Sequence, residues 1–237
     1  MIKHLLAVVV LATAAMSAAA DEAQIRKVVG DKLGVKVEGV QPGPLGLYEV
    51  RYKSAQGGGM RIVYTDANAT HIFVGKIYEA ASERDLTEER MRKLNAVKFD
   101  SLPLDQAVKI QRGSGKRVLA MFSDPHCPYC KSIEQTLQQI DDITIYVFMF
   151  PVIRPDLADQ SKAVWCSPDR AKAWIDVALR GKPPTVAPSC ANPVEKNLQL
   201  GRSLGVNSTP TLILASGEKV SGALTKDDLT DLLDAKN

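Results

Sequence analysis

This chain has no dense block of basic residues, no internal repeat and no long apolar run after residue 20. Without a basic block, and with a net charge of only +3, the sequence indicates no nucleic-acid partner. No segment after residue 20 is apolar enough to cross a bilayer. A hydrophobic content of 45% and a charged content of 24% are typical of a soluble globular protein.

Cysteine is scarce, and its spacing argues against a structural metal site. A zinc site takes four ligands, usually as two close pairs or as cysteine with histidine. Here Cys127 and Cys130 are close, but Cys166 and Cys190 lie far along the chain, and no second motif joins His126 to complete a set. The spacing therefore favours another use of the close pair, and we expect no bound metal.

The first twenty residues predict an export signal. Lys3 precedes an apolar run over residues 5–20, which ends in the A-x-A cleavage pattern of Ala18 to Ala20. A membrane anchor is the alternative, but the run is short for a span and ends in small residues. We expect a signal peptide over residues 1–20, removed on export to an oxidising compartment where an even number of cysteines indicates disulfide chemistry.

Residues 21–80 predict a small α+β unit. Apolar residues at helical spacing predict a helix over residues 21–34, and alternation predicts a strand over residues 47–52. Two further strands are expected over residues 60–66 and 70–80. So small a sheet buries only a modest core and leaves strand edges exposed, so we expect a dimer.

Residues 81–100 differ in character, because charges dominate and apolar positions are sparse between residues 82 and 98. Thr87 can cap a helix, and Glu88 and Glu89 suit the positive end of its dipole. The pattern fits a solvated surface helix or a rigid linker helix between two domains. Its position between two differently patterned segments favours the linker.

From residue 101 to residue 237 the pattern is α/β. Continuous apolar runs predict buried strands, and a long middle stretch is mostly helical. The first elements expected are a strand over residues 117–122, a helix from residue 128 and a strand over residues 143–150. A helical stretch over residues 155–205 follows, then two paired strands over residues 210–215 and 219–222, and a last helix over residues 225–236.

The sequence Cys127-Pro128-Tyr129-Cys130 fits thiol–disulfide exchange. Cys127 follows a buried strand and stands at the N-cap of a helix, with Pro128 at the first helical position, where proline is favoured. The free N–H groups of Tyr129 and Cys130, with the helix dipole, stabilise a thiolate on Cys127, the attacking species in exchange. Cys130, one turn on, can resolve the mixed disulfide. Covalent haem would need histidine where Lys131 stands.

Residues near the pair are candidates for support. His126 either adds favourable charge when protonated or is a polar loop residue, and the sequence leaves both open. Asp124 fits a turn or a cap better than a catalytic acid. Thr209-Pro210 precedes a buried strand, where proline removes one ladder donor. A proline at a strand start is uninformative alone, but its order after the cysteine motif gives it weight.

The order strand, C-P-Y-C at a helix start, strand, then T-P before a hairpin and a final helix resembles the thioredoxin family over residues 101–237. In that family the bond between Thr209 and Pro210 would be cis, pack on the active-site sulfurs and help to bind extended substrate. With the leader, the N-terminal α+β unit and the helical insertion, the mature chain resembles the DsbC/DsbG family of periplasmic thiol:disulfide interchange proteins, closest to DsbC.

The resemblance implies an α+β protein: a cystatin-like dimerisation domain over residues 21–80, a linker helix, and a thioredoxin-fold domain with a helical insertion. It further implies a homodimeric disulfide isomerase whose cleft binds misfolded proteins, with the membrane reductase DsbD as electron donor. No cofactor is implied beyond the redox-active disulfide. The implied roles are catalysis by Cys127 and Cys130, and support by His126, Pro128, Tyr129, Thr209 and Pro210.

The resemblance also implies a structural disulfide between Cys166 and Cys190. A second redox pair is the alternative, but their spacing is wide and no helix-start motif surrounds them.

Two residues depart from the pattern of the families that the chain resembles. Pro128-Tyr129 replaces the Gly-Tyr of the best-known DsbC sequence and also occurs in DsbG, which leaves open a DsbG-like sulfenic-acid reductase and chaperone that protects single thiols. Met121 stands where many thioredoxins keep a buried acid, which predicts a more oxidising couple.

Overall fold

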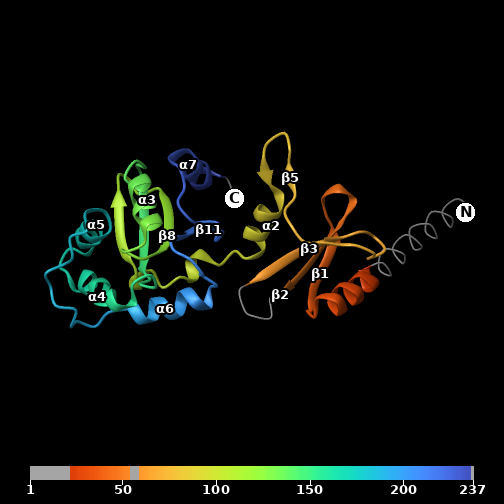
Figure 1. Ribbon diagram of the computed structural model, residues 1–237. Coiled ribbons are helices and arrows are strands. Elements are labelled where there is room, and N and C mark those ends of the chain that lie inside the picture. Colours follow the sequence, from red (N-terminus) through yellow and green to blue (C-terminus); the bar gives the residue numbers. More distant parts are fainter. Residues whose placement is uncertain (1–21, 54–58, 236–237) are drawn as a thin grey trace, which may run out of the picture. The chain divides into compact units, whose positions relative to one another are not determined.

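The computed structural model describes residues 22–53 and 59–235 (Figure 1). The chain forms two compact units, one ending at Leu94 and the other beginning at Asn95. The predicted signal peptide lies outside the described residues. Within the described ranges, no helix is both long enough and apolar enough to span a membrane.

The first unit is a helix packed on an antiparallel sheet. The helix spans residues 22–33, as its apolar spacing predicts, and fully buries Ile25 and Val29. Val50 and Val63 of the sheet join them in one core cluster. The strands pair in the order β1-β2-β3-β4, which are Val37–Pro42, Tyr48–Lys53, Met60–Thr65 and Ile72–Phe73.

The single strand predicted over residues 70–80 is wrong. Strand β4 stops at Phe73, and the chain bends at Gly75. Strand β5 (Tyr78–Glu79) then pairs with β6 (Arg84–Asp85) in a separate two-stranded ribbon. The apolar residues of this stretch therefore do not belong to one continuous ladder.

Helix α2 spans Leu86–Leu94 and is shorter than the predicted stretch of residues 82–98, because strand β6 occupies its expected first turn. The cap also differs from the prediction. The carboxylate of Asp85 accepts a hydrogen bond from the backbone N–H of Glu88 at 2.8 Å, as a capping side chain does. Thr87, the predicted cap, is buried instead.

Helix α2 packs against the sheet of the first unit. The Thr87 hydroxyl shares a hydrogen bond with the Tyr64 hydroxyl at 2.8 Å and accepts another from the Ile77 N–H at 3.0 Å. Arg90 donates to the buried carboxylate of Glu49 at 3.0 Å. The helix is thus not a solvated surface helix, whereas its role as a linker stays a prediction.

The second unit is built on a five-stranded sheet in the order β11-β10-β8-β9-β7. Strands β8 and β9 are parallel, and the other neighbours are antiparallel. Strand β7 is an addition to the predicted elements. The strands are β7 (Val108–Arg112), β8 (Arg117–Ser123), β9 (Ile143–Met149), β10 (Thr211–Leu214) and β11 (Lys219–Ser221).

Helices cover both faces of this sheet (Figure 1). Residues that alternate along β8 point to opposite faces, so Met121 packs with α3 while Phe122 packs with the aromatic rings of Phe148 and Phe150. The predicted helical stretch forms a short 3₁₀ helix at Pro155–Leu157 and three α-helices, and residues 181–193 between the last two are irregular. The helices are α3 (Pro128–Leu137), α4 (Ala158–Cys166), α5 (Arg170–Arg180), α6 (Val194–Ser203) and α7 (Lys226–Asp234).

Candidate active site

The cysteine pair lies at the junction of strand β8 and helix α3. Strand β8 ends at Ser123, and Cys127 has the extended backbone of an N-cap, with φ −86° and ψ 122°, directly before Pro128. This is the placement that the sequence predicts. Cys127 and Cys130 are free thiols and are 4% and 1% exposed. Neither sulfur is held in a disulfide, and both side chains are almost wholly covered by the protein.

Asp124 organises the turn that carries both cysteines. One carboxylate oxygen accepts a hydrogen bond from the His126 N–H at 2.8 Å, and the other accepts from the Ile153 N–H at 2.7 Å. Its carbonyl oxygen accepts from the Cys127 N–H at 3.1 Å, and its own N–H donates to the Cys130 sulfur at 3.4 Å. The side chain is fully buried, so Asp124 is the turn residue that its position predicts.

Burial raises the pKa of Cys130 to about 12. The Ser123 hydroxyl, the Asp124 N–H and Thr209 oppose that rise, whereas the neighbouring Cys127 adds to it. Cys130 is therefore a thiol at neutral pH, and its thiolate fraction is very small. A thiol in this state attacks slowly, because the thiolate is the nucleophile in exchange.

We expect iodoacetamide at pH 7 to alkylate Cys127 of the reduced, folded protein and to leave Cys130 unmodified. Cys130 is both more deeply buried and protonated, whereas Cys127 lies at the positive end of α3. Peptide mapping by mass spectrometry measures the two positions separately. Protein unfolded in denaturant, in which both cysteines should react, is the control. Faster modification of Cys130 in the folded protein would contradict this order.

The loop before strand β10 contacts the cysteine pair. The peptide bond between Thr209 and Pro210 is cis, as the family resemblance implies, and both residues are buried. The Cys127 thiol donates a hydrogen bond to the Thr209 carbonyl oxygen at 3.3 Å. Thr211 then pairs with Phe122 of β8, which fixes the loop beside the cysteine turn. Residues 82 positions apart are thereby brought into contact.

The other three predicted supporting side chains differ in exposure. Tyr129 is 67% exposed next to Cys127, and Pro128 is also exposed. His126 is half-buried, and its Nε2 atom has no hydrogen-bond partner. This position fits both roles considered for His126, a favourable charge when the ring is protonated and a polar loop residue.

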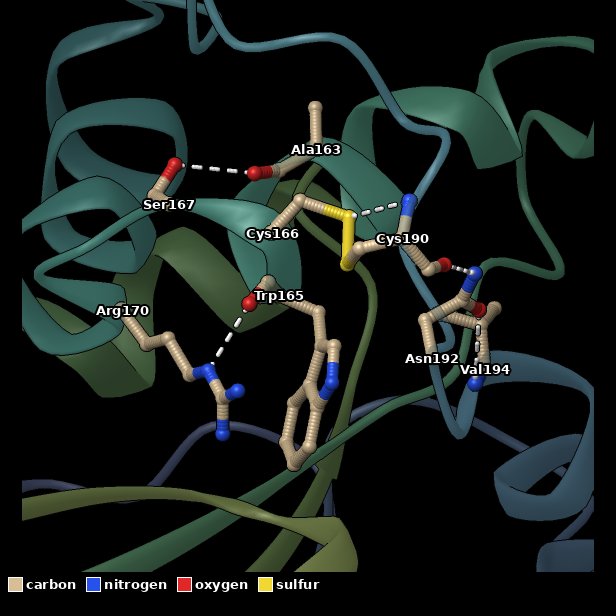
Figure 2. The surroundings of a disulfide bond; sticks show 8 residues. All are labelled: Ala163, Trp165, Cys166, Ser167, Arg170, Cys190, Asn192 and Val194. Atoms are coloured by element: carbon tan, nitrogen blue, oxygen red, sulfur yellow. Dashed lines mark hydrogen bonds between the residues drawn. A yellow bond between two sulfur atoms is a disulfide. The ribbon is translucent and has the colours of Figure 1, made fainter.

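Cys166 and Cys190 form a disulfide bond with an S–S distance of 2.03 Å (Figure 2). The bond ties the end of α4 to the irregular segment before α6. The Cys190 N–H donates to the Cys166 sulfur at 3.3 Å, and next to it the Arg170 guanidinium lies 3.7 Å from the centre of the Trp165 ring. The disulfide implied by the family resemblance is thus part of the helical insertion.

Glu134 is a buried acid that the sequence reading does not single out. It lies on α3, fully buried, and accepts a hydrogen bond from Trp174 Nε1 on α5 at 2.5 Å. Burial raises the pKa of Glu134 to about 7, although the Trp174 bond and the charge of Arg112 oppose the rise. Helical spacing could have indicated that Glu134 is buried, because position 134 falls on the same buried face of α3 as Ile133 and Leu137.

A cluster of metal ligands is not found in the described parts of the chain, where no three His, Cys, Asp or Glu side chains gather. That no metal or other cofactor binds stays a prediction.

Two family models match the chain. The thioredoxin-like domain matches residues 104–237, and the disulfide bond isomerase protein N-terminal domain matches residues 16–88. Together the two matches cover most of the chain, and they agree with an α+β protein made of two differently built parts.

Curated relatives and a solved structure are similar to the chain. The probable thiol:disulfide interchange protein DsbC of Bordetella parapertussis is 44% identical over 196 residues, covering 83% of this chain and 68% of the relative. The DsbC protein of Escherichia coli K12 is 28% identical over 226 residues, covering 92% and 89%. A disulfide interchange protein of Neisseria gonorrhoeae has a TM-score of 0.54 and 42% identity, covering 56% of this chain and 96% of its own.

Proposed function

Since the chain belongs to the DsbC family of thiol:disulfide interchange proteins, we propose that it is a periplasmic disulfide isomerase acting on misfolded proteins. Its thioredoxin-like domain alone does not separate isomerases from reductases and oxidases. The observation that carries the isomerase is the match of residues 16–88 to the N-terminal domain of disulfide bond isomerase proteins. The export signal predicted over residues 1–20 supports the periplasm.

In the proposed reaction the Cys127 thiolate attacks one sulfur of a non-native disulfide. The substrate S–S bond breaks, a new S–S bond joins Cys127 to the substrate, and the second substrate sulfur leaves as a thiolate. That thiolate attacks another disulfide of the same substrate. A substrate thiolate finally displaces Cys127, so the number of disulfides is unchanged and only their partners differ.

The state of Cys130 favours this outcome. Cys130 can attack the mixed disulfide, which forms a Cys127–Cys130 disulfide and releases a reduced substrate. Because burial raises the pKa of Cys130 to about 12, this attack is slow at neutral pH. The mixed disulfide then lasts long enough for the substrate's own thiols to rearrange.

Two partners complete the proposal. We infer a homodimer through residues 21–80, supported by two exposed apolar side chains at the sheet edge: Phe73 of β4 is 50% exposed, and Val74, directly after β4, is 78% exposed. Each reduction of substrate by Cys130 leaves the cysteines oxidised, so two electrons must come from outside. By family resemblance the donor is the membrane reductase DsbD.

The test is the reactivation of scrambled ribonuclease by the mature chain. An isomerase restores ribonuclease activity while the number of substrate disulfides stays constant. A chain that is inert on scrambled ribonuclease but reduces a sulfenic acid on a single protein thiol would contradict the isomerase and support the DsbG-like alternative. Light scattering on the same sample measures the oligomeric state, and a monomer would contradict the dimer.

A further inference from the structure

The buried end of strand β8 carries a hydroxyl that has no partner in the resting protein. Ser123 is the last residue of β8 and is 0% exposed. Among the residues that the structure describes, none lies in hydrogen-bonding geometry with Ser123 Oγ. Buried polar atoms are nearly always paired, so this donor is available for a partner that the reduced, resting protein does not present.

The pleat of β8 directs the Ser123 side chain toward helix α3. Side chains alternate between the two faces of a strand, so Ser123 shares a face with Met121, two residues earlier. Met121 belongs to one core cluster with Ile133 and Leu137 of α3. Ser123 therefore lies on the face of the sheet that α3 covers, at the end of the strand from which the chain turns toward Cys130.

The hydroxyl of Ser123 faces the sulfur of Cys130. The N–H of the next residue, Asp124, donates to that sulfur at 3.4 Å. Burial raises the pKa of Cys130, and the Ser123 hydroxyl is the group that opposes this rise most. The strand end is held in place, because the Phe150 N–H donates to the Ser123 carbonyl oxygen at 2.9 Å. A hydroxyl hydrogen rotates about the C–O bond, so it can turn to the sulfur once the sulfur is charged.

Cys130 carries a charge only while it reacts. To resolve a mixed disulfide, the Cys130 thiol loses its proton to solvent and its thiolate attacks the Cys127 sulfur. The Cys127–Cys130 bond forms, the bond from Cys127 to the substrate breaks, and the substrate sulfur leaves as a thiolate, so no outside oxidant is needed. In the reverse reaction a reductant attacks Cys127, and Cys130 leaves as a thiolate.

Building on the proposed function, we propose that the Ser123 hydroxyl donates to the Cys130 thiolate as it forms and so sets the rate at which Cys130 resolves the mixed disulfide. A donor that binds the thiolate but not the thiol stabilises the reacting state more than the resting state. In a buried site such a hydrogen bond is stronger than in water. Ser123 thereby determines how long the mixed disulfide lasts, and how often a client leaves rearranged rather than reduced.

The test is a single turnover of the full mature chain with the aromatic disulfide dithiobis(nitrobenzoate), which releases one coloured thiolate in each of two steps. The first release measures the attack by Cys127. The second is intramolecular, does not depend on the reagent concentration, and measures the attack by Cys130. Ser123→Ala should keep the first rate and lower the second about three- to tenfold at pH 7. The thiolate fraction falls, and the greater nucleophilicity of a more basic thiolate offsets about half of that loss.

The matched control is Ser161→Ala. Ser161 lies on α4, is also fully buried, and within the described residues its hydroxyl has no hydrogen-bond partner either. The same atom is removed from similar surroundings, and both releases should keep their rates. Ser123→Thr restores a hydroxyl and should recover the second rate. An unchanged second rate in Ser123→Ala, an equal fall in both rates, or a similar fall in Ser161→Ala would overturn the proposal.

The equilibrium between dithiol and disulfide separates this role from a structural one. At pH 7 Cys130 is a thiol in the reduced protein and is bonded in the oxidised protein, so neither end state contains the thiolate that Ser123 binds. Ser123→Ala should therefore have the reduction potential of the parent in a glutathione buffer. Reduction of its Cys127–Cys130 disulfide by glutathione should slow by the same factor as the second release. A shifted potential would contradict the proposal and assign Ser123 to the structure of one end state.

Failure of the proposed function is visible separately. Both releases require only thiol:disulfide interchange. A slower second release in Ser123→Ala, in a chain that does not reactivate scrambled ribonuclease, supports the Ser123 donor and contradicts the isomerase. If the parent reactivates ribonuclease but parent and Ser123→Ala release the second thiolate equally fast, the isomerase is supported and the donor is contradicted.

Discussion

Replacing Cys127 by alanine is expected to lower the reactivation of scrambled ribonuclease to the uncatalysed rate. Cys127 stands at the N-cap of α3, beside the Thr209 carbonyl, and is the more exposed of the two free thiols. Cys130 cannot take its place, because it is 1% exposed and burial raises its pKa to about 12. The variant therefore retains a thiol but loses the nucleophile.

The matched variant Cys130→Ala should behave differently. It keeps the attacking sulfur and loses only the intramolecular thiol that resolves the mixed disulfide. We expect covalent complexes between the variant and ribonuclease, visible on a non-reducing gel and dispersed by a reductant.

The control for both variants removes the remote pair together, as Cys166→Ala/Cys190→Ala, which leaves no odd thiol. This variant should retain the rate of reactivation per folded molecule, because the pair lies in the helical insertion and is already bonded. Catalysis by Cys127→Ala, or its loss in the remote double variant with the fold intact, would assign the chemistry to the wrong pair.

The second large effect is a dependence of stability on pH that arises from Glu134. Its folded pKa is about 7, above the ordinary 4.5, so between these values the folded state binds more protons than the unfolded state. Stability is therefore fully present below pH 4.5 and is lost as the pH rises to about 7. We expect this carboxyl to contribute a fall of about 2 to 3 kcal/mol in the free energy of unfolding between pH 5 and pH 8.

The variant Glu134→Gln isolates this contribution. Its amide oxygen can still accept the Trp174 N–H but does not titrate, so its stability should change less over the same range. Both tryptophans of the chain, Trp165 and Trp174, belong to the second unit, so denaturant unfolding followed by tryptophan fluorescence reports that unit alone. Equal pH profiles for parent and variant would show that the carboxyl does not titrate in this range.

Sequence reasoning succeeds where the chemistry is local. The position of Cys127 at a helix start follows from a buried run, a proline and helical spacing within about fifteen residues. The order strand, helix, strand around α3 is also predicted, and the structure adds that the two strands pair in parallel. Contacts such as that of Thr209 with Cys127 could be predicted only through family resemblance, because 82 residues separate them.

The sequence-based prediction misses strands β1 and β7 and the partners of two buried acids. Strand β1 contains Gly39 and ends at Pro42, two residue types depleted in strands, so tertiary pairing with β2 overrides a weak propensity. Strand β7 does show a signal, since Val108 and Ile110 alternate with polar residues. The hydrogen-bond partners of Asp124 and Glu134 lie on distant segments, and a single sequence does not indicate which distant residues are in contact.

The disulfide between Cys166 and Cys190 has a consequence for how this protein is made. Four cysteines can pair in three ways, and in two of them both cysteines of the reactive motif are bonded to cysteines of the helical insertion. A thiol:disulfide interchange protein thus has a pairing problem of its own during biogenesis. Material oxidised after synthesis in a reducing cytosol would be a mixture of isomers, whereas chains exported as proposed would mature where mispaired bonds can be exchanged.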